Sequence, residues 1–342
     1  MGLNKRLIDQ AGAVGAAGTD NFEPVIYSGN GTSAGSVNTI TGVGFQPDLV
    51  WIKNRDNAND HFLTDSVRGA GAYISSNNTD AEDTTDRFDS FDSNGFTVST
   101  DTALLNNSSY NYVSWCWKAG GTAVSNTDGS VTSSVSANQE AGFSIVKFTA
   151  PSSSNVNFTA GHGLSTTPEI VFTKVTSRSG TWHVWSQYLS NTLTNYLKLN
   201  DTNAEVTFPN MWGTGQTSSV ISLRSDASTY SGEDHIAYCF HSVDGYQKVG
   251  SFTGDGNTSQ DITTDFQPRF LLVKDTSASS HWFLYDSERG VGENTTNVVL
   301  PNNSTSELTG REGVEFLSNG FRMYDGDNFN INGNTILYLA IA

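Results

Sequence analysis

Three segments of the chain carry the same order of polar and apolar residues: a proline, a mostly apolar run of β-prone residues, and a lysine six positions after the proline. They are GFQPDLVWIK at 44–53, LSTTPEIVFTK at 164–174 and DFQPRFLLVK at 265–274. Proline is tolerated at the first residue of a strand, so each segment predicts a buried strand. The lysine is expected at the sheet edge, with its amino group in water. Three copies at fixed spacing indicate an internal repeat.

Other landmarks recur in the same register. The apolar pairs around Asn-Gly at 91–96 (FDSNGF) and 316–321 (FLSNGF) are strong hairpin signals. Closing strands are predicted at 112–118, 235–241 and 336–341. About 100 residues per copy, with short strands between turns rich in Gly, Asn, Asp and Ser, is the size of one β-sandwich, and one barrel per copy is the alternative.

The repeats divide the chain into five parts. The 122–140 stretch lacks aromatic residues and is rich in Gly, Ser and Thr, which predicts a linker, although its spaced valines would let it pair as an edge strand. The predicted parts are an N-terminal anchor or tail at 1–21, a first module at 22–121, the linker at 122–140, a second module at 141–244 and a third at 245–342.

The composition fits several buried β cores. Of the 342 residues, 11% are aromatic and only 15% are charged, unlike a disordered chain. A net charge of −17 argues against nucleic acid and against an anionic membrane surface as partners. No apolar run approaches the roughly 18–20 residues of a membrane span. The N-terminus is a poor secretion signal, so synthesis in a cytoplasm is expected.

The two cysteines, Cys116 and Cys239, occupy equivalent positions in two repeats, where the third has Ala340. Equivalent core positions of separate modules do not normally meet, so two buried free thiols are predicted.

Candidate binding residues follow the repeated strands. DSVRG at 65–69 and DSERG at 286–290 match closely, whereas the second copy lacks both charges. The Asp–Arg pair closes a turn or belongs to a sugar- or protein-binding loop. The candidates are Asp65, Arg68, Asp286, Arg289, Trp182 and Trp282. His61 and His281 are expected to be equivalent, and the histidines show no metal spacing.

Acidic stretches offer a second kind of site. The densest runs from residue 80 to residue 92, and a solvated loop competes there with calcium, which prefers oxygen-rich loops. A glycan hydrolase would instead use a carboxylate pair such as Asp83 and Asp86. No serine-hydrolase or phosphate-loop motif is present, so no enzyme activity is expected and Ca²⁺ is the one possible cofactor. The weak calcium candidates are Asp89, Asp92, Asp325 and Asp327.

With GFQPDLVWIKNRD, DSVRG, FDSNGF and YVSWCWKAGG in view, residues 22–342 resemble repeat modules of virion proteins of marine tailed bacteriophages. Such proteins are described as tail-fibre or structural proteins. The resemblance implies a non-enzymatic virion component with a jelly-roll or concanavalin-lectin-like β-sandwich in each repeat. The second copy departs from the pattern in DSVRG and in the Asn-Gly hairpin.

The expected function is therefore a tail-fibre or receptor-binding protein of the virion that contacts host surface polysaccharide. Residues 1–21 would bind other virion proteins, and a homotrimer is expected from the resemblance. Low charge density with abundant Asn, Ser, Thr and aromatic residues suits sugar contacts. The alternatives are a capsid decoration or tail adaptor protein, and the glycan hydrolase.

Overall fold

The computed structural model describes residues 21–31, 37–85, 87–99, 103–292, 296–311, 313–325 and 330–342. These residues form 26 β-strands and no α-helix, which confirms the all-β prediction. Within the described ranges, no helix is long and apolar enough to cross a membrane. The predicted anchor lies outside them except for Asn21.

The first module (residues 22–117) has two antiparallel sheets. The main sheet has the order β1-β7-β3-β4, and the smaller sheet has the order β2-β6-β5. The strands are β1 Phe22–Ser28, β2 Asn38–Thr41, β3 Leu49–Asn54, β4 Phe62–Asp65, β5 Phe88–Asp92, β6 Gly95–Val98 and β7 Asn111–Trp117.

The second module (residues 124–240) repeats this main sheet as β10-β17-β12-β13 and extends it to eight strands with β9-β8 at one edge and β14-β15 at the other. The predicted linker at 122–140 is therefore wrong, because β8 and β9 lie within it; its valines pair as the alternative foresaw. The strands are β8 Val124–Asn126, β9 Ser133–Asn138, β10 Phe143–Thr149, β11 Asn157–Gly161, β12 Ile170–Val175, β13 His183–Ser186, β14 Asn195–Lys198, β15 Val206–Thr207, β16 Val220–Arg224 and β17 Asp234–Phe240.

The third module (residues 247–341) returns to a four-stranded main sheet, β18-β26-β20-β21. Its partners are the three-stranded sheet β19-β25-β24 and the pair β22-β23. The strands are β18 Gln247–Thr253, β19 Ser259–Thr263, β20 Phe270–Asp275, β21 Trp282–Asp286, β22 Thr296–Val298, β23 Leu308–Arg311, β24 Val314–Leu317, β25 Gly320–Tyr324 and β26 Thr335–Ile341.

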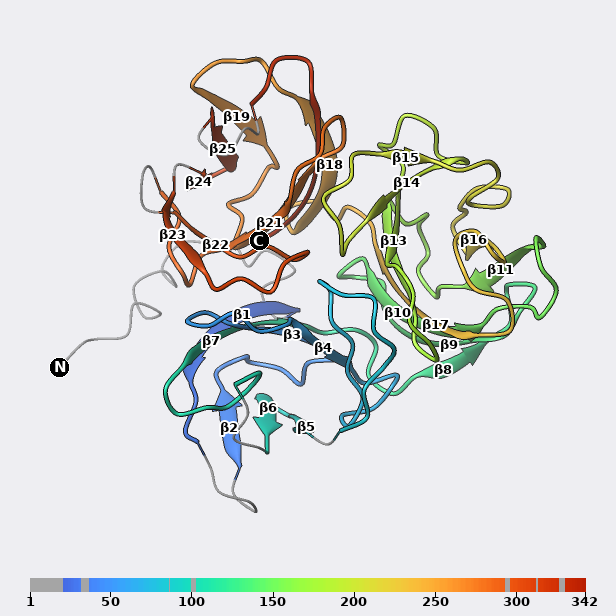
Figure 1. Ribbon diagram of the computed structural model, residues 1–342, viewed down its shortest axis with the longest axis horizontal. Coiled ribbons are helices and arrows are strands. Elements are labelled where there is room, and N and C mark those ends of the chain that lie inside the picture. The colour runs from blue at the N-terminus through green and yellow to red at the C-terminus, as the bar shows by residue number, and fades with distance from the viewer. Residues whose placement is uncertain are drawn as a thin grey trace.

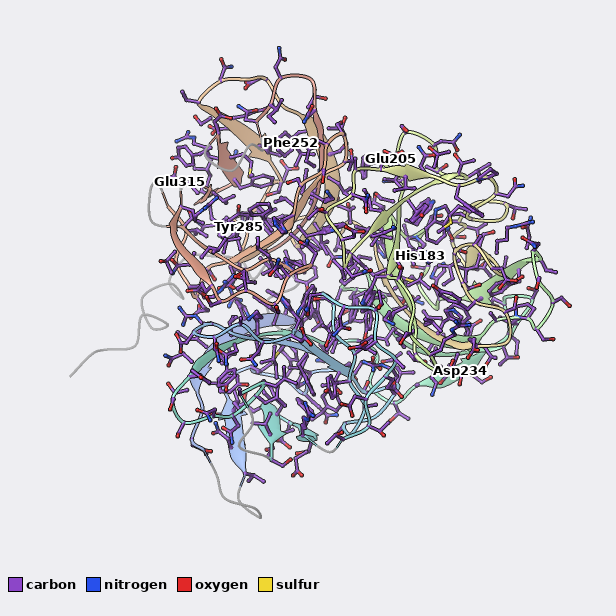
Figure 2. All side chains as sticks on the ribbon, in the orientation of Figure 1. His183, Glu205, Asp234, Phe252, Tyr285 and Glu315 are labelled. Atoms are coloured by element: carbon purple, nitrogen blue, oxygen red, sulfur yellow. The ribbon has the colours of Figure 1, made fainter. Side chains whose placement is uncertain are left out.

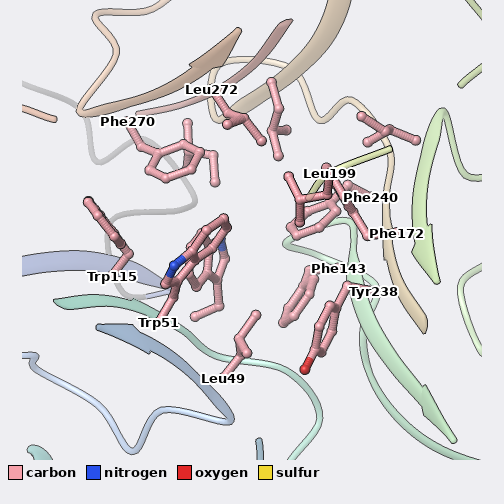
Figure 3. Packing of buried hydrophobic residues seen from close by; sticks show 14 of the residues in the cluster. Leu49, Trp51, Trp115, Phe143, Phe172, Leu199, Tyr238, Phe240, Phe270 and Leu272 are labelled. Atoms are coloured by element: carbon pink, nitrogen blue, oxygen red, sulfur yellow. The ribbon is translucent and has the colours of Figure 1, made fainter. Parts of the chain in front are cut away.

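The three main sheets surround one shared hydrophobic core, and each also covers a core of its own (Figures 1 and 3). In β3, Leu49 and Trp51 face the shared core, whereas Val50 and Ile52 face the core of the first module. The equivalent strands β12 and β20 alternate in the same way. Because both faces are covered, the strands need apolar residues at every position, which explains their unbroken apolar runs.

The chain closes into a ring of three modules, since the third module returns to the first (Figure 1). The ring of Phe270 lies edge-on to that of Phe22 at 5.3 Å, and Arg269 forms an ion pair with Glu23 at 2.8 Å. Side chains fill both the modules and the space between them (Figure 2). Equivalent core positions stay apart: Cys116 and Cys239 are buried free thiols in separate module cores, as predicted.

The edges of the main sheets at β1, β10 and β18 are each protected in a different way. In the second module, β9 pairs with β10. In the first, Pro24 removes an N–H from β1. In the third, the Ser242 hydroxyl accepts from the Val249 N–H at 3.1 Å. Each arrangement blocks the addition of a further strand at an equivalent edge.

Candidate functional site

The repeated lysines lie inside the molecule, and the expectation of an amino group in water is wrong. Lys53, Lys174 and Lys274 are fully buried. Lys174 Nζ donates to the carbonyl oxygen of Asp80 in the first module at 2.8 Å, and Lys274 Nζ donates to that of Ser280 at 2.8 Å. Burial lowers the pKa of each of the three lysines to about 8. Lys174 and Lys274 hold main-chain carbonyl groups across contacts between modules, Lys274 through Thr202 O of the second module at 3.3 Å. Lys53 instead donates to Asn54 O at 2.6 Å and Asn57 O at 3.3 Å within its own module.

Trp182 and Trp282 make equivalent contacts between modules. The Trp182 indole N–H donates to Ser75 O in the first module at 2.8 Å, and that of Trp282 donates to Lys198 O in the second at 2.8 Å. The first module places His61 at this position, because β3–β4 and β20–β21 share one register. His61 is thus equivalent to Trp282, and the expected equivalence with His281 is wrong by one residue.

His61 acts as a neutral donor in place of the indole. Its Nδ1 accepts from the Trp51 indole N–H at 2.9 Å, which leaves the proton on Nε2, 3.0 Å from Leu300 O in the third module. Burial holds the pKa of His61 well below its usual value. The three contacts therefore run in one direction around the ring: second to first, third to second and first to third.

Three loops receive these contacts, and we call them the interface loops: residues 75–82 (SSNNTDAE), 198–205 (KLNDTNAE) and 300–307 (LPNNSTSE). Their shared asparagine accepts from a main-chain N–H: Asn200 from Trp182 and Asn302 from Trp282, both at 2.9 Å. Their final glutamate donates its N–H to the next module, as Glu82 does to Thr176 O at 2.9 Å. The loops thus share a further repeated motif, Asn-x-Thr/Ser-x-x-Glu, at 77–82, 200–205 and 302–307. It is visible in the sequence, but the site prediction did not include it.

The Asp65–Arg68 pair lies buried between the first and second modules. The two side chains are at most 1% exposed and approach to 2.6 Å. The Arg68 guanidinium also reaches Glu82 at 3.1 Å, and Tyr238 of the second module donates its hydroxyl to Asp65 at 2.8 Å. Burial raises the pKa of Tyr238, so its hydroxyl remains a donor.

The Asp286–Arg289 pair occupies the equivalent place between the third and first modules. Both side chains are fully buried and approach to 2.6 Å. Arg289 also binds Glu307 at 3.2 Å, and Glu307 in turn forms an ion pair with Arg55 of the first module at 2.9 Å. Trp115 takes the place of Tyr238 and donates its indole N–H to Asp286 at 2.8 Å.

The second module lacks this ion pair, and its own residues fill the space and bind the glutamate that would otherwise face an arginine. Ser186 and Leu189 stand at the positions of the aspartate and arginine, and Leu189 packs in the shared core. Glu205, without an arginine, accepts from the Ser190 N–H at 2.9 Å and from the Asn195 amide. The six residues predicted as surface binding candidates are therefore buried interface residues, and this prediction is corrected: a ligand outside the molecule cannot reach them.

The calcium candidates do not converge. Asp89 and Asp325 are exposed, and Asp92 accepts from Ser90 and Thr97 at 2.7 and 2.6 Å within its own hairpin. Asp327 lies outside the described residues. Among the described residues, no group of three or more His, Cys, Asp or Glu side chains is arranged to hold a metal ion.

A surface pocket of about 390 Å³ opens in the first module beside its interface loop. A volume of this size falls within the range of small-molecule sites. Asp83 accepts from the Tyr73 hydroxyl at 2.7 Å, and Arg87 lies 5.3 Å over the Tyr73 ring. Hydrogen bonds from Thr85 lower the pKa of Asp83. The polar residues of the lining are Asn59, Asp60, Tyr73, Ser75, Asn78, Asp80, Asp83 and Arg87.

The other modules build the same backbone without these carboxylates. Tyr73 pairs with Asp83, as Tyr196 pairs with Val206 and Val298 with Leu308. At the position of Asp60 they have Thr181 and His281, and at that of Asp80 they have Asn203 and Thr305. The acidic character of this pocket is therefore specific to the first module and is not required for folding.

Comparison with known proteins adds a family and no named relative. The model of a protein family described as "Domain of unknown function (DUF7483)" matches residues 17–342, so one model spans all three modules. None of the curated proteins matches the chain. Because the matched region is nearly the whole sequence, this three-module chain belongs to the DUF7483 family, a domain of unknown function.

Proposed function

We propose that this chain is a non-enzymatic structural protein of a tailed-bacteriophage virion, of the tail-fibre or receptor-binding type, which contacts host surface glycan. One observation carries the proposal. The motifs shared by the three modules are used to close the ring, whereas the polar surface pocket is specific to one module. A rigid body with variable outer loops suits an appendage that presents a binding site.

The internal contacts support a body that resists unfolding and proteolysis. The shared core joins all three modules, and buried ion pairs lie at two of their three contacts. No module can leave the ring without exposing the apolar surface that it contributes to the shared core, which is unfavourable in water. Such cooperative closure suits the exterior of a particle.

The chemistry of the pocket supports binding without catalysis. A glycan hydrolase needs a carboxylic acid with a raised pKa to protonate the leaving group. The pKa of Asp83 is lowered, so this carboxylate is ionised at neutral pH and accepts hydrogen bonds. Asp86, its proposed partner, lies outside the described residues.

We propose that residues 1–21 attach the protein to other virion proteins after its synthesis in the host cytoplasm. Around the ring, each module already buries its inner apolar face against the other two modules. A homotrimer, as expected from the resemblance, would therefore assemble through the N-terminal segment or through outer surfaces. Light scattering of the full chain and of a variant lacking residues 1–20 tests this assignment.

The decisive experiment is to locate the protein in purified virions by antibody labelling and cryo-electron microscopy. The proposal expects labelling along the tail and inhibition of phage adsorption by the purified chain. Labelling on the capsid shell would identify a decoration protein instead. Absence of the chain from purified virions would overturn the virion assignment altogether.

A further inference from the structure

We propose that the pocket of the first module binds a hydroxyl-rich ligand without negative charge, namely a neutral or an amino sugar. This inference rests on the proposed glycan-binding function and assigns it a site and a ligand class. The residues that carry it are Asn59, Asp60, Asn78, Asp80, Asp83 and Arg87.

The wall of the pocket is held in place by the neighbouring module. The Gly180 N–H donates to Thr79 O at 2.7 Å, and the Glu82 N–H donates to Thr176 O at 2.9 Å. Lys174 Nζ donates to Asp80 O at 2.8 Å. These contacts use main-chain atoms of the interface loop, so they fix its path without involving the side chains of Asn78 and Asp80. A pre-organised wall lowers the entropic cost of binding.

The side chains offer acceptors suited to hydroxyl and ammonium groups. Within the described residues, the Asp80 carboxylate makes no hydrogen bond or ion pair, and it is exposed. The pocket holds three carboxylates and one guanidinium, that of Arg87. Ionised carboxylates accept strong hydrogen bonds from hydroxyl or ammonium donors and repel anions. Sugars bearing carboxylate, sulfate or phosphate groups are therefore excluded.

Comparison between the modules shows that the carboxylates of Asp80 and Asp83 are not needed for folding. Asn203 and Thr305 stand at the position of Asp80, and both loops still keep main-chain contacts with their neighbours. Glu205 N–H donates to Thr276 O at 2.8 Å, and Glu307 N–H donates to Arg55 O at 2.9 Å, as Glu82 does to Thr176 O. In the same way, Val206 and Leu308 replace Asp83 in the paired backbone. An acidic residue that appears in one copy alone, at a pocket, points to a ligand rather than to the framework.

The test is a glycan array that carries neutral, amino and acidic saccharides, probed with the full chain and followed by calorimetric titration of the saccharide that binds best. Asp80→Asn introduces the amide that the second module has at this position, so folding is expected to be unchanged. The matched control is Asp244→Asn, which removes one charge at another surface pocket, lined by residues 242–245, 247–248 and 264–265.

The proposal expects binding to neutral or amino saccharides, weakened about tenfold or more by Asp80→Asn and less than about twofold by Asp244→Asn. Equal affinity of wild type and Asp80→Asn would place the sugar elsewhere and overturn the site, while leaving the virion assignment intact. Binding confined to acidic saccharides, binding lost on calcium chelation, cleavage of the saccharide, or no binding to any saccharide would each overturn the inference.

Discussion

The indole Nε1 of Trp115 donates a hydrogen bond of 2.8 Å to Oδ2 of Asp286, 171 residues further along the chain. Arg289, the ion-pair partner of Asp286, lies 5.4 Å over the Trp115 ring. One aromatic side chain of the first module therefore contacts both halves of a buried ion pair in the third. This contact closes the ring, and it predicts how the molecule responds to the loss of either charge.

Asp286→Ala is expected to reduce the free energy of unfolding by about 3–5 kcal/mol, because it leaves the buried guanidinium of Arg289 without its closest partner. Urea denaturation followed by tryptophan fluorescence measures the loss. Ser186→Ala removes the equivalent side chain of the second module, a neutral hydrogen bond to Glu169 O, and should cost only about 1 kcal/mol. Equal losses at the two sites would contradict a buried, mutually dependent ion pair.

Replacing both charged residues tests whether the cost of a single replacement comes from the unpaired charge that it leaves. Asp286→Ser with Arg289→Leu reproduces the Ser186 and Leu189 pair of the second module. We expect the double variant to be more stable than Asp286→Ser alone, by about 1–3 kcal/mol, because it removes the uncompensated charge. Urea denaturation of both single variants and of the double variant measures the coupling. If the free-energy losses of Asp286→Ser and Arg289→Leu add up to that of the double variant, the pair is not coupled.

The sequence predicted the modules better than it predicted their assembly. The Pro-to-Lys repeats identified β3, β12 and β20, since an apolar run bounded by turns is a local signal. The same run cannot tell what covers its two faces. Leu49 and Trp51 could have faced a second sheet, yet they face two other modules. For the same reason, the sequence could not show that the binding candidates Trp182 and Trp282 are buried at contacts between modules.

The candidate pocket was foreseen only in part. The sequence pointed to the acidic run at 80–92 with Asp83, but as a solvated loop, a calcium loop or a hydrolase carboxylate pair, and a further signal was not used. The interface loops share Asn-x-Thr/Ser-x-x-Glu in three copies, and comparing them shows an acidic residue, Asp80, where the other copies have Asn203 and Thr305. The predicted sites gave weight to charged residues that recur. In a repeat protein, however, recurring charges such as Asp65 and Asp286 serve the common framework. Ligand chemistry is better sought where one copy differs from the others.

Gly320→Ala is expected to destabilise the third module by about 1–3 kcal/mol or more. A Cβ atom at this position would lie 2.0 Å from the carbonyl oxygen of Ile262, and both groups belong to paired strands that cannot shift freely. Gly71→Ala is the control, since a Cβ there meets nothing within 4 Å. Thermal unfolding of both variants provides the comparison, and similar melting temperatures would contradict the close approach of β19 and β25.

Gly320 also refines the predicted hairpins. Both hairpins exist, but Asp92 pairs with Gly95 and Leu317 pairs with Gly320, so each glycine opens a strand and the turn comprises the two residues before it. The Asn-Gly signal therefore located the hairpin correctly and its turn one residue too late.

Acid is expected to weaken the fold between about pH 7 and pH 5, because several histidines are buried as neutral rings. Burial lowers the pKa of His162, His183 and His235 to about 4. In the unfolded chain their pKa returns to about 6.5. The unfolded state then binds more protons than the folded state as the pH falls below 6.5, so stability decreases with decreasing pH. Each histidine contributes a loss of about 2 kcal/mol by pH 5.

The geometry of His162 allows this prediction to be tested at a single residue. Its Nδ1 accepts from the Leu164 N–H at 3.1 Å, so a second ring proton would break that bond. His162→Gln keeps a side chain that can both accept and donate, but it does not titrate. Urea denaturation from pH 8 to pH 5 should show wild type losing stability more steeply than the variant, by about 2 kcal/mol over the range. Parallel pH profiles would mean that His162 is not buried as a neutral ring.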